Sequence, residues 1–233
     1  EIGSGLVGSE MCIRDSVWMW KNSTPSPTVR EDIMLSEDIL QAAEEEWTLS
    51  GRTYTDETAD SIKGQKLEFD SIHFVRCRFT DCDFTGASFC NVVFDKCDFS
   101  NSSFEDSYWK NTRAEGCKGD GSRFSNASFK WVKLTDSQFR YANFSMAFWE
   151  FSEIRGCSLR EAFLSEVRFK KTICSRTDFT GVDFFKTLLR GMDLSDCTID
   201  NIMVSDQYTE LAGVKVNLFQ AAELAKLMGV KIV

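Results

Sequence analysis

Cysteine is the residue type in this chain whose spacing most suggests chemistry. Nine cysteines are present, and five recur at multiples of 20 residues: Cys77, Cys97, Cys117, Cys157 and Cys197. Such a ladder could bind a metal, but no CxxC pair or neighbouring histidine completes a zinc set. We favour the alternative interpretation that reduced cysteine fills small apolar core positions. Free thiols then indicate a reducing compartment, so we expect a cytoplasmic protein.

Catalytic groups are the second source of chemistry to consider, and the sequence shows none in a productive pattern. His73 is the only histidine and has no partner at a suggestive spacing. The P-loop, GxGxxG and GxSxG motifs are missing. The aspartates are scattered among polar residues, as on a hydrated surface. We therefore predict a protein that is not an enzyme, has no cofactor and acts by binding.

Most of these cysteines and aspartates lie within a sequence pattern that repeats every five residues. Phenylalanine occupies every fifth position from Phe79 to Phe104, and the same register holds from Phe69 to Val204 over 28 units. A small residue usually lies two positions before each centre. A helix repeats near 3.6 residues and a strand near 2, so neither brings these rings to one side. A chain that bends at every unit and closes into stacked coils does so, with parallel pairing between coils.

Units such as CDFTG, ASFCN and TDFTG resemble those of the pentapeptide-repeat family, over about residues 67–206. The resemblance implies an all-β fold, a right-handed quadrilateral parallel β-helix with four units in each coil of 20 residues. Twenty-eight units would form about seven coils, with short helical N- and C-terminal caps. In this register the five cysteines share one side of the core.

The first 16 residues have no relation to the repeat. They contain LVGSEMCIRDS, which resembles a translated transposase sequencing adapter, and we interpret residues 1–16 as an assembly artefact. A secretory signal is the alternative, but Glu10, Arg14 and Asp15 leave no apolar core segment.

Three further segments follow. Residues 17–50 are expected to hold a linker and an acidic amphipathic helix over Arg30–Trp47, with one side formed by Ile33, Ile39, Leu40, Ala43 and Trp47. Residues 51–206 form the β-helix, in which Gly51–Gly64 leads into the repeat and closes its end. Residues 207–233 form a C-terminal cap and dimerisation segment.

The C-terminal cap is predicted to contain a strand at Val214–Val216, a helix from an Asn217 cap through Leu227, and a last strand at Val230–Val233. It resembles the tail of the quinolone-resistance (Qnr- and MfpA-like) group at Gly213, Val214, Lys215, Asn217, Gln220, Ala221, Met228, Gly229, Val230 and Val233. The resemblance implies a homodimer. The candidate interface residues are Leu218, Phe219, Leu224, Leu227, Met228, Val230 and Val233. Unlike Gram-negative Qnr proteins, this chain has no loops that interrupt the register.

Two hypotheses describe the binding function. By resemblance, the rod would imitate DNA and bind bacterial DNA gyrase or topoisomerase IV, changing fluoroquinolone sensitivity. The carboxylates that would replace phosphates are Asp178, Asp183, Asp193, Asp196, Asp200 and Asp206. The alternative is a general protein–protein interaction scaffold that binds an unknown partner through Trp131 and Phe151, which share a corner one coil apart. A cover formed by the N-terminal helix competes with a partner at that corner.

Net charge and hydropathy restrict the partner. The formal net charge of −9 argues against direct binding of nucleic acid, and no apolar run approaches the length of a membrane span. The charge is nevertheless uneven, because residues 107–176 carry 13 bases and 7 acids. Within this basic belt Lys110, Lys130, Lys170 and Arg190 lie on one side, interrupted by Glu150. They are expected to contact either an acidic partner or water.

One interior coil is predicted to be weak. Ala114 and Gly119 occupy consecutive centres where phenylalanine is usual. The missing rings would leave a cavity or a bend, unless Trp109 or Phe139 has moved into the space.

Overall fold

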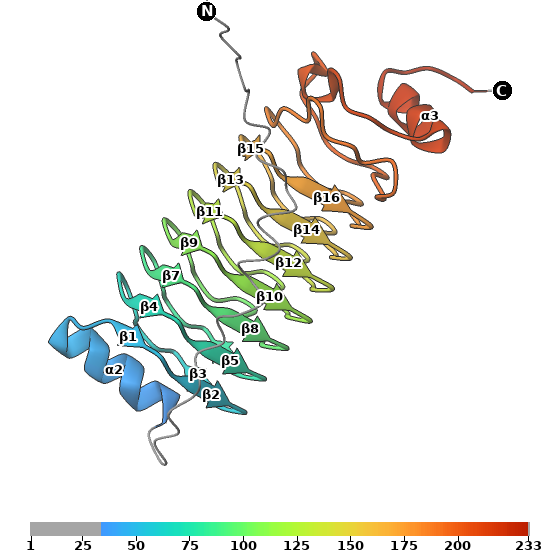
Figure 1. Ribbon diagram of the computed structural model, residues 1–233. Coiled ribbons are helices and arrows are strands. Elements are labelled where there is room, and N and C mark those ends of the chain that lie inside the picture. Colours follow the sequence, from blue (N-terminus) through green and yellow to red (C-terminus); the bar gives the residue numbers. More distant parts are fainter. Residues whose placement is uncertain (1–33, 233) are drawn as a thin grey trace, which may run out of the picture.

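The computed structural model describes residues 34–232 and shows a rod of stacked coils (Figure 1). One side of the rod, called face 1, is a seven-stranded parallel sheet in the order β1 (Leu49–Ser50), β4 (Glu68–Asp70), β7 (Ser88–Cys90), β9 (Tyr108–Lys110), β11 (Ser128–Lys130), β13 (Phe148–Glu150) and β15 (Arg168–Lys170). The next side, face 2, is a second seven-stranded parallel sheet, formed by β2 (Thr53–Thr55), β5 (His73–Val75), β8 (Val93–Asp95), β10 (Arg113–Glu115), β12 (Lys133–Thr135), β14 (Glu153–Arg155) and β16 (Ile173–Ser175).

Faces 3 and 4 complete each coil. Face 3 begins with β3 (Thr58–Asp60) and β6 (Arg78–Thr80) and continues as single parallel bridges, and face 4 consists of such bridges throughout. The register advances by 20 residues per coil, since Leu49 pairs with Phe69 and Phe69 with Phe89. This confirms the predicted parallel β-helix with four units per coil.

The five-residue period has a backbone cause. The residue two positions after each centre lies at a corner and usually adopts a left-handed conformation, as at Asn91 (φ 57°), Asn111 (φ 57°) and Lys171 (φ 53°). An isolated left-handed residue turns the chain sharply, so each unit contributes one corner and four corners close a coil. Asn, Asp and Gly fill many corners because they tolerate positive φ better than other residues.

Stacked aromatic rings fill the core. Phe69 lies 4.8 Å from Phe89 between ring centroids, and Phe129 lies 3.9 Å from Trp149. Such rings stack on their equivalents in the next coil, and many meet the rings of adjacent faces edge-on, as Phe69 meets Phe84 at an interplanar angle of 77°. The small inward column is also buried, and its cysteines are as inaccessible as its alanines: Cys77, Cys97, Cys117 and Ala127 are at most 2% exposed.

The predicted weak coil is repaired by its neighbours. At Gly119 an added Cβ would lie 2.7 Å from the ring of Phe139 and 2.9 Å from that of Phe99, so these rings occupy the missing volume. A cavity of about 10 Å³ remains beside Ala114. It is lined by apolar side chains and is barely large enough for one water molecule. Of the two alternatives for Gly119, the structure therefore supports the one in which Phe139 has moved in.

The N-terminal cap is a helix, α2 (Leu35–Glu45), packed on the first coil (Figure 1). Its buried residues are Leu35, Asp38, Ile39 and Ala42. The predicted apolar side was wrong, because Leu40, Ala43 and Trp47 are exposed and only Ile39 of that set is buried, with Ile33 outside the described residues. The cause is Asp38, which is buried because it accepts hydrogen bonds from Tyr54 and Arg52 on the coil below.

The first coil begins earlier than the recognisable repeat. Residues 51–64, expected to lead into the repeat and close its end, instead form a complete coil together with Leu49 and Ser50, through β1, β2, β3 and the Lys63–Asp83 bridge. The end of the rod is covered by α2 instead. The segments assigned to an artefact and a linker, residues 1–16 and 17–30, lie outside the described residues.

At the other end the ladders separate. Faces 3 and 4 continue to Thr198 and Met203, but within the described chain no backbone hydrogen bond joins residues 187–196 to β15 or β16. That segment pairs onward instead: the N–H groups of Leu189, Gly191 and Leu194 donate to carbonyls of residues 210–215 at 2.9–3.0 Å. As a result the inward residues Phe169, Thr172 and Met192 are only half-buried.

A 3-10 turn, η1 (Thr209–Leu211), and the helix α3 (Leu218–Leu227) complete the C-terminal cap. Asn217 caps α3 as predicted: its Oδ1 accepts from the Gln220 N–H at 3.0 Å, and Gln220 Oε1 accepts from the Asn217 N–H at 2.7 Å. The predicted strand at Val214–Val216 is reduced to one bridge between Asp193 and Lys215, and residues 230–232 form no strand. None of the helices within residues 34–232 is long and apolar enough to cross a membrane.

Candidate binding surfaces

The cysteine ladder is part of the core. The thiol of Cys77 donates to the Tyr54 carbonyl at 3.4 Å, and that of Cys97 to the Phe74 carbonyl at 3.3 Å. Burial raises the pKa of Cys82 to about 11, which keeps this thiol protonated at neutral pH. Across residues 34–232, no group of three or more His, Cys, Asp or Glu side chains could hold a metal ion. These contacts fit the interpretation of cysteine as a small core residue.

Several candidate aspartates support turns. Asp178 Oδ1 accepts hydrogen bonds from the Thr180 N–H and hydroxyl at 2.9 and 2.6 Å. Asp193 makes the same two contacts with Ser195, at 3.1 and 2.6 Å, and they lower its pKa. Asp183 accepts from the Phe185 N–H and, through its other oxygen, from Ser165. Asp178, Asp183 and Asp193 therefore stabilise the fold as well as carrying charge.

The aspartates do not form one row. Asp178 bridges to Thr198 on face 3, Asp183 to Met203 on face 4, and Asp193 to Lys215 on face 2. The remaining three, Asp196, Asp200 and Asp206, are exposed in the last turns before η1. The structure thus gathers the six carboxylates at one end of the rod but spreads them over three sides.

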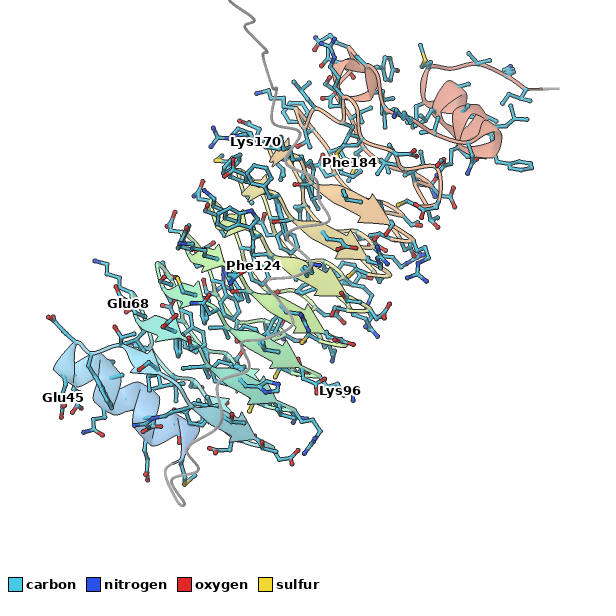
Figure 2. All side chains as sticks on the ribbon, in the orientation of Figure 1. Glu45, Glu68, Lys96, Phe124, Lys170 and Phe184 are labelled. Atoms are coloured by element: carbon cyan, nitrogen blue, oxygen red, sulfur yellow. The ribbon has the colours of Figure 1, made fainter. Side chains whose placement is uncertain are left out.

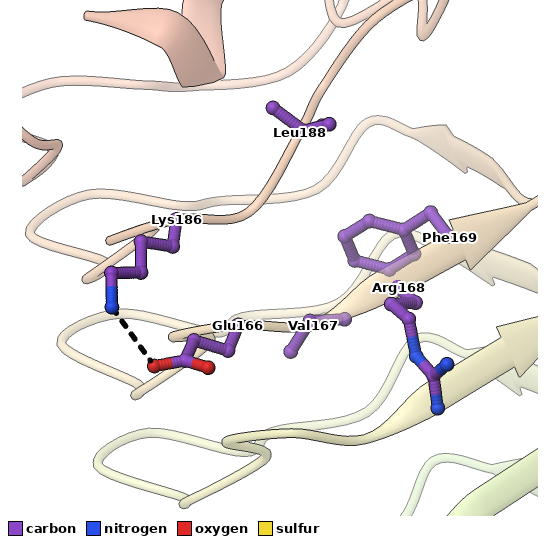
Figure 3. Close-up of a pocket in the computed structure, with 6 residues that line it drawn as sticks. All are labelled: Glu166, Val167, Arg168, Phe169, Lys186 and Leu188. Carbon is purple, nitrogen blue, oxygen red and sulfur yellow. Dashed lines mark ion pairs between the residues drawn. The ribbon is translucent and has the colours of Figure 1, made fainter. Parts of the chain in front are cut away.

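A hollow of about 320 Å³ opens where face 1 loses its ladder (Figure 3). The half-buried ring of Phe169 lies at its base, and Leu188, 62% exposed, lies on the separated strand. Glu166 and Lys186 form an ion pair of 3.6 Å at its edge. This hollow was not predicted from the sequence, although Met192 stands at a position where a small residue is usual.

Lysines of the basic belt stack on face 1, and Lys170 extends from the outside of the coils (Figure 2). Glu150 lies between Lys130 and Lys170 and pairs with both, at 3.4 and 2.6 Å. The ammonium groups of Lys170 and Lys130 lower the pKa of Glu150, which therefore stays ionised. This one carboxylate thus partly offsets the repulsion between the stacked lysines.

Trp131 and Phe151 face the solvent, as predicted. Their rings stack at 6.0 Å between centroids with an interplanar angle of 24°, and they are 42% and 39% exposed. Lys130 Nζ lies 4.8 Å above the Trp131 ring, and Lys171 Nζ lies 5.0 Å from the Phe151 ring. Lys171 was not among the candidates, although the 20-residue register places it at the same corner. α2 does not cover this corner, because its apolar side is packed on the first coil.

The candidate dimer residues divide into two sets. Leu218, Phe219, Met228 and Val230 are 81%, 84%, 61% and 50% exposed, whereas Leu224 and Leu227 pack partly against the core. Val233 lies outside the described residues. Gln220 holds α3 to the rod by donating to the carbonyls of Leu194 and Cys197 at 2.8 and 2.6 Å. One side of α3 is therefore docked, and its first turn projects two large apolar side chains into solvent.

Comparison with solved structures finds the same fold. A trypsin-treated variant of QnrB1, described as a plasmid-mediated fluoroquinolone resistance protein, is 23% identical, with a TM-score of 0.51 over 79% of this chain and 92% of that one. Full-length QnrB1 is 18% identical, with a TM-score of 0.45 over 76% and 100%. A pentapeptide repeat protein from the Arabidopsis thaliana thylakoid lumen is 23% identical, with a TM-score of 0.41 over 42% and 68%. No curated protein sequence matches the chain.

Family models agree with the repeat register. A model of the pentapeptide repeat region matches residues 87–164, and a model of eight pentapeptide repeat copies matches residues 152–185 and 164–201. Both matches lie within the coils whose centres pair every 20 residues. Sequence period, coil geometry and these matches together show that residues 87–201 of the chain are pentapeptide repeats.

Proposed function

We propose that this protein is a non-enzymatic scaffold that binds a macromolecular partner through the outside of its rod. The observation that carries the proposal is the filled interior: central side chains from Phe69 to Ile202 pack on each other, and almost all of them are buried. Ligand contacts are therefore confined to outward positions, where long flat faces present side chains at regular intervals. The free thiols favour a reducing compartment, and we place the protein in the cytoplasm.

Crosslinking in living cells tests this proposal. The tagged full chain would be crosslinked, purified under denaturing conditions and analysed by mass spectrometry. We expect one or a few partner proteins, with crosslinks from outward lysines of the rod. Turnover of small-molecule substrates by the purified chain, with no partner crosslinked, would contradict it.

We further propose a homodimer formed by the C-terminal cap. Leu218 and Phe219 project from the start of α3, with Met228 and Val230 beyond its end, and all four are exposed. Two caps related by a twofold axis would bury both sets of side chains in one isologous contact. The dimer would place the exposed aspartates Asp196, Asp200 and Asp206 on either side of its axis.

A bacterial type II topoisomerase is a second, more specific candidate for the partner. The three exposed aspartates near the proposed axis favour it, as does the likeness of fold to a fluoroquinolone resistance protein. Two observations oppose it: the aspartates are spread over several sides, and the basic belt has no counterpart on duplex DNA. The proposed mode is occupation of the surface where the enzyme binds DNA.

A gyrase supercoiling assay with and without a fluoroquinolone, at two salt concentrations, tests this candidate. We expect inhibition or drug protection that weakens as salt rises. The combined change Asp196→Asn, Asp200→Asn and Asp206→Asn should abolish it. A matched control changes three exposed aspartates of the first coils, Asp60, Asp81 and Asp106, to asparagine. No effect of the full chain on gyrase or topoisomerase IV at micromolar dimer would exclude this partner and leave the scaffold proposal in place.

A further inference from the structure

The corner between faces 1 and 2 holds aromatic residues at positions poorly suited to them. Trp131 and Phe151 have φ of 54° and 52°, the left-handed region that bulky residues rarely adopt. The equivalent residues one coil earlier and two coils earlier are Asn111 and Asn91, which adopt that conformation readily. Asparagine would therefore close the same corner with less strain, so the aromatic side chains are not explained by the fold.

These two rings are held in a fixed arrangement although they face solvent. They stack on each other, and Lys130 and Lys171 lie 4.8 and 5.0 Å from their centroids. Lys130 is itself fixed by Glu150 at 3.4 Å. An exposed aromatic pair with such supports presents a pre-ordered apolar surface, which lowers the entropy cost of binding a partner.

The charge around the rings is strongly positive. In the four coils from Lys110 to Ile173, the positions flanking this corner carry six bases and two acids, a net charge of +4: Lys110, Arg113, Lys130, Lys133, Lys170 and Lys171 against Glu150 and Glu153. On faces 3 and 4 the bases of the same coils are matched by carboxylates about one coil away, as in the Lys118–Asp98, Arg123–Glu105, Arg140–Asp120 and Arg160–Asp178 pairs. The excess positive charge is thus concentrated on one edge of the rod.

We propose that this edge, centred on Trp131 and Phe151, binds an acidic segment of a partner protein that also carries large apolar side chains. The apolar side chains would lie against the two rings and the carboxylates would pair with Lys110, Lys170 and Lys171. The assignment rests on the proposed scaffold function and names the surface and the chemistry of the partner. It is independent of the acidic cap residues on which topoisomerase binding would depend.

Nucleic acid fits this edge less well than an acidic protein segment. The rings stack on each other, and lysine ammonium groups lie near both, so a base that stacked on a ring would compete with contacts the rings already make. The coils before and after the belt are acidic, with net charges of −5 over residues 67–106 (three bases, eight acids) and −4 over 177–206 (two bases, six acids). They would repel a phosphate chain that extended beyond the belt.

Selection from a random 12-residue peptide display library tests the proposal. The unmodified full chain is the target, and the double variant Trp131→Asn, Phe151→Asn is the counter-target. We expect enriched peptides that combine several Asp or Glu residues with Trp, Phe, Leu or Ile. A labelled enriched peptide should bind the parent in fluorescence anisotropy, and about tenfold more weakly to the double variant. Binding should weaken with salt and in the variant Lys110→Gln, Lys171→Gln.

Two matched controls separate the edge from general effects. Tyr141 is another exposed aromatic residue at a left-handed corner (φ 59°), and Tyr141→Asn should leave peptide binding unchanged. Lys66→Gln, Lys96→Gln removes two lysines from other corners and should also leave it unchanged. The double variant should unfold at the temperature of the parent, because asparagine suits the corner.

Four outcomes would overturn the assignment. The first is that no peptide is enriched on the parent over the double variant, and the second is that the enriched peptides lack acidic residues. The third is that Tyr141→Asn weakens peptide binding as much as the double variant does. The fourth is that a dT20 oligonucleotide binds the parent more tightly than the enriched peptide does, and that the double variant loses this binding. If the parent chain self-associates and the double variant does not, the molecule that binds this edge is a second copy of this chain and not a different protein. If crosslinking finds partners while this edge selects no peptide, the scaffold function stands and the edge assignment fails.

Discussion

Both ends of the rod are covered by a helix, but only the N-terminal helix buries its apolar side chains against the adjacent coil. At the N-terminal end α2 buries Leu35, Ile39 and Ala42 completely against the first coil. At the C-terminal end α3 leaves Leu218 and Phe219 more than four-fifths exposed. Each end has the same physical problem, since the last coil presents unpaired backbone and apolar core to water. At the N-terminal end α2 covers the exposed core within one chain. At the C-terminal end α3 leaves apolar side chains that another molecule could cover.

Hydrogen bonds between each helix and the coil beside it also differ between the two ends. Asp38 on α2 reaches into the first coil and accepts from Tyr54 at 2.5 Å and from Arg52, which fixes the helix in one orientation. Glu57 of the first coil accepts from the N–H of Leu35 at the start of α2. α3 is attached at its first turn through Asn217 and Gln220, and at its end by the Tyr208 hydroxyl, which donates to the Leu227 carbonyl at 2.8 Å. The N-terminal end should therefore respond strongly to single changes, and the C-terminal helix only weakly.

The largest expected effect is that of Asp38→Ala. It leaves the Arg52 guanidinium and the Tyr54 hydroxyl beneath α2 without their acceptor. Because Arg52 keeps about a quarter of its side chain exposed, we expect a loss near the lower end of the ~3–5 kcal/mol typical of broken buried pairs. Urea denaturation followed by tryptophan fluorescence measures it. The control Asp56→Asn removes the charge from the exposed Arg76–Asp56 pair, keeps a side chain suited to the left-handed corner (φ 59°), and should leave the midpoint unchanged. Equal midpoints for the two variants would show that α2 is not locked by Asp38.

Gly119→Phe tests whether the body between the ends is as well fitted as the N-terminal cap. A side chain at this position would meet Phe139 at 2.7 Å and Phe99 at 2.9 Å, so it overpacks the core. We expect a loss of at least ~1–3 kcal/mol, measured by the same denaturation. Ala114→Val, beside the cavity of about 10 Å³, should cost less. Stabilisation by Gly119→Phe would show that the coil has open space after all.

Most of the fold could be predicted because each five-residue unit repeats the same signal. A large centre and a small residue two positions earlier suffice to place every inward side chain from Phe69 onward. The first coil was missed because its centres are Leu49, Tyr54, Ala59 and Gly64, two of which are small. Arg52 and Glu57 also occupy positions where a small residue is usual.

The remaining differences between the predictions and the structure come from contacts between segments that are distant in the sequence. The buried side of α2 depends on Asp38, a residue that looks solvated until Arg52 and Tyr54 are placed beneath it. The exposed aromatic corner was predictable, since register alone puts Trp131 and Phe151 together. The turn role of Asp178 and Asp193 also has a sequence signal, an aspartate two residues before Thr or Ser. The separated ladder at residues 187–196 is caused by pairing with the C-terminal cap, and its sign in the sequence is limited to Met192, which stands where a small residue is usual.

Glu210 allows the C-terminal end to be weakened in a pH-dependent way. Its carboxylate is fully buried and accepts from Ser205 and the N–H of Lys186. Burial alone would raise its pKa, but these hydrogen bonds together lower it. A lowered folded-state pKa stabilises the fold above the unfolded value of about 4.3, and this contribution is lost as pH falls through the folded pKa.

The corresponding variant is Glu210→Gln. We expect it to lower the free energy of unfolding by about 1–2 kcal/mol at pH 7, because a charged acceptor is replaced by a neutral one. The difference from the parent should shrink as pH is lowered from 5 toward 3, measured by urea denaturation at each pH. A difference that grows on acidification would mean that burial, and not the hydrogen bonds, controls this carboxyl group.

The smallest effect on stability, with the clearest effect on assembly, is expected from Leu218→Glu, Phe219→Glu. Both side chains are more than four-fifths exposed in one chain, so the change should hardly alter unfolding of the monomer. In the proposed dimer each of the four side chains gains burial of the kind worth ~1.5–3 kcal/mol per large apolar residue, and four carboxylates in their place repel each other. We therefore expect light scattering to show a dimer for the parent and a monomer for the variant.

Deletion of residues 217–233 should also give a monomer, but with a less stable last coil, because Gln220 no longer binds the carbonyls of Leu194 and Cys197. The control Phe163→Glu changes an apolar residue that is 46% exposed on face 4 and should remain dimeric. A parent that is monomeric at 100 times the concentration used for the other measurements would remove the difference between the two ends, since exposed apolar side chains on α3 would then need no partner.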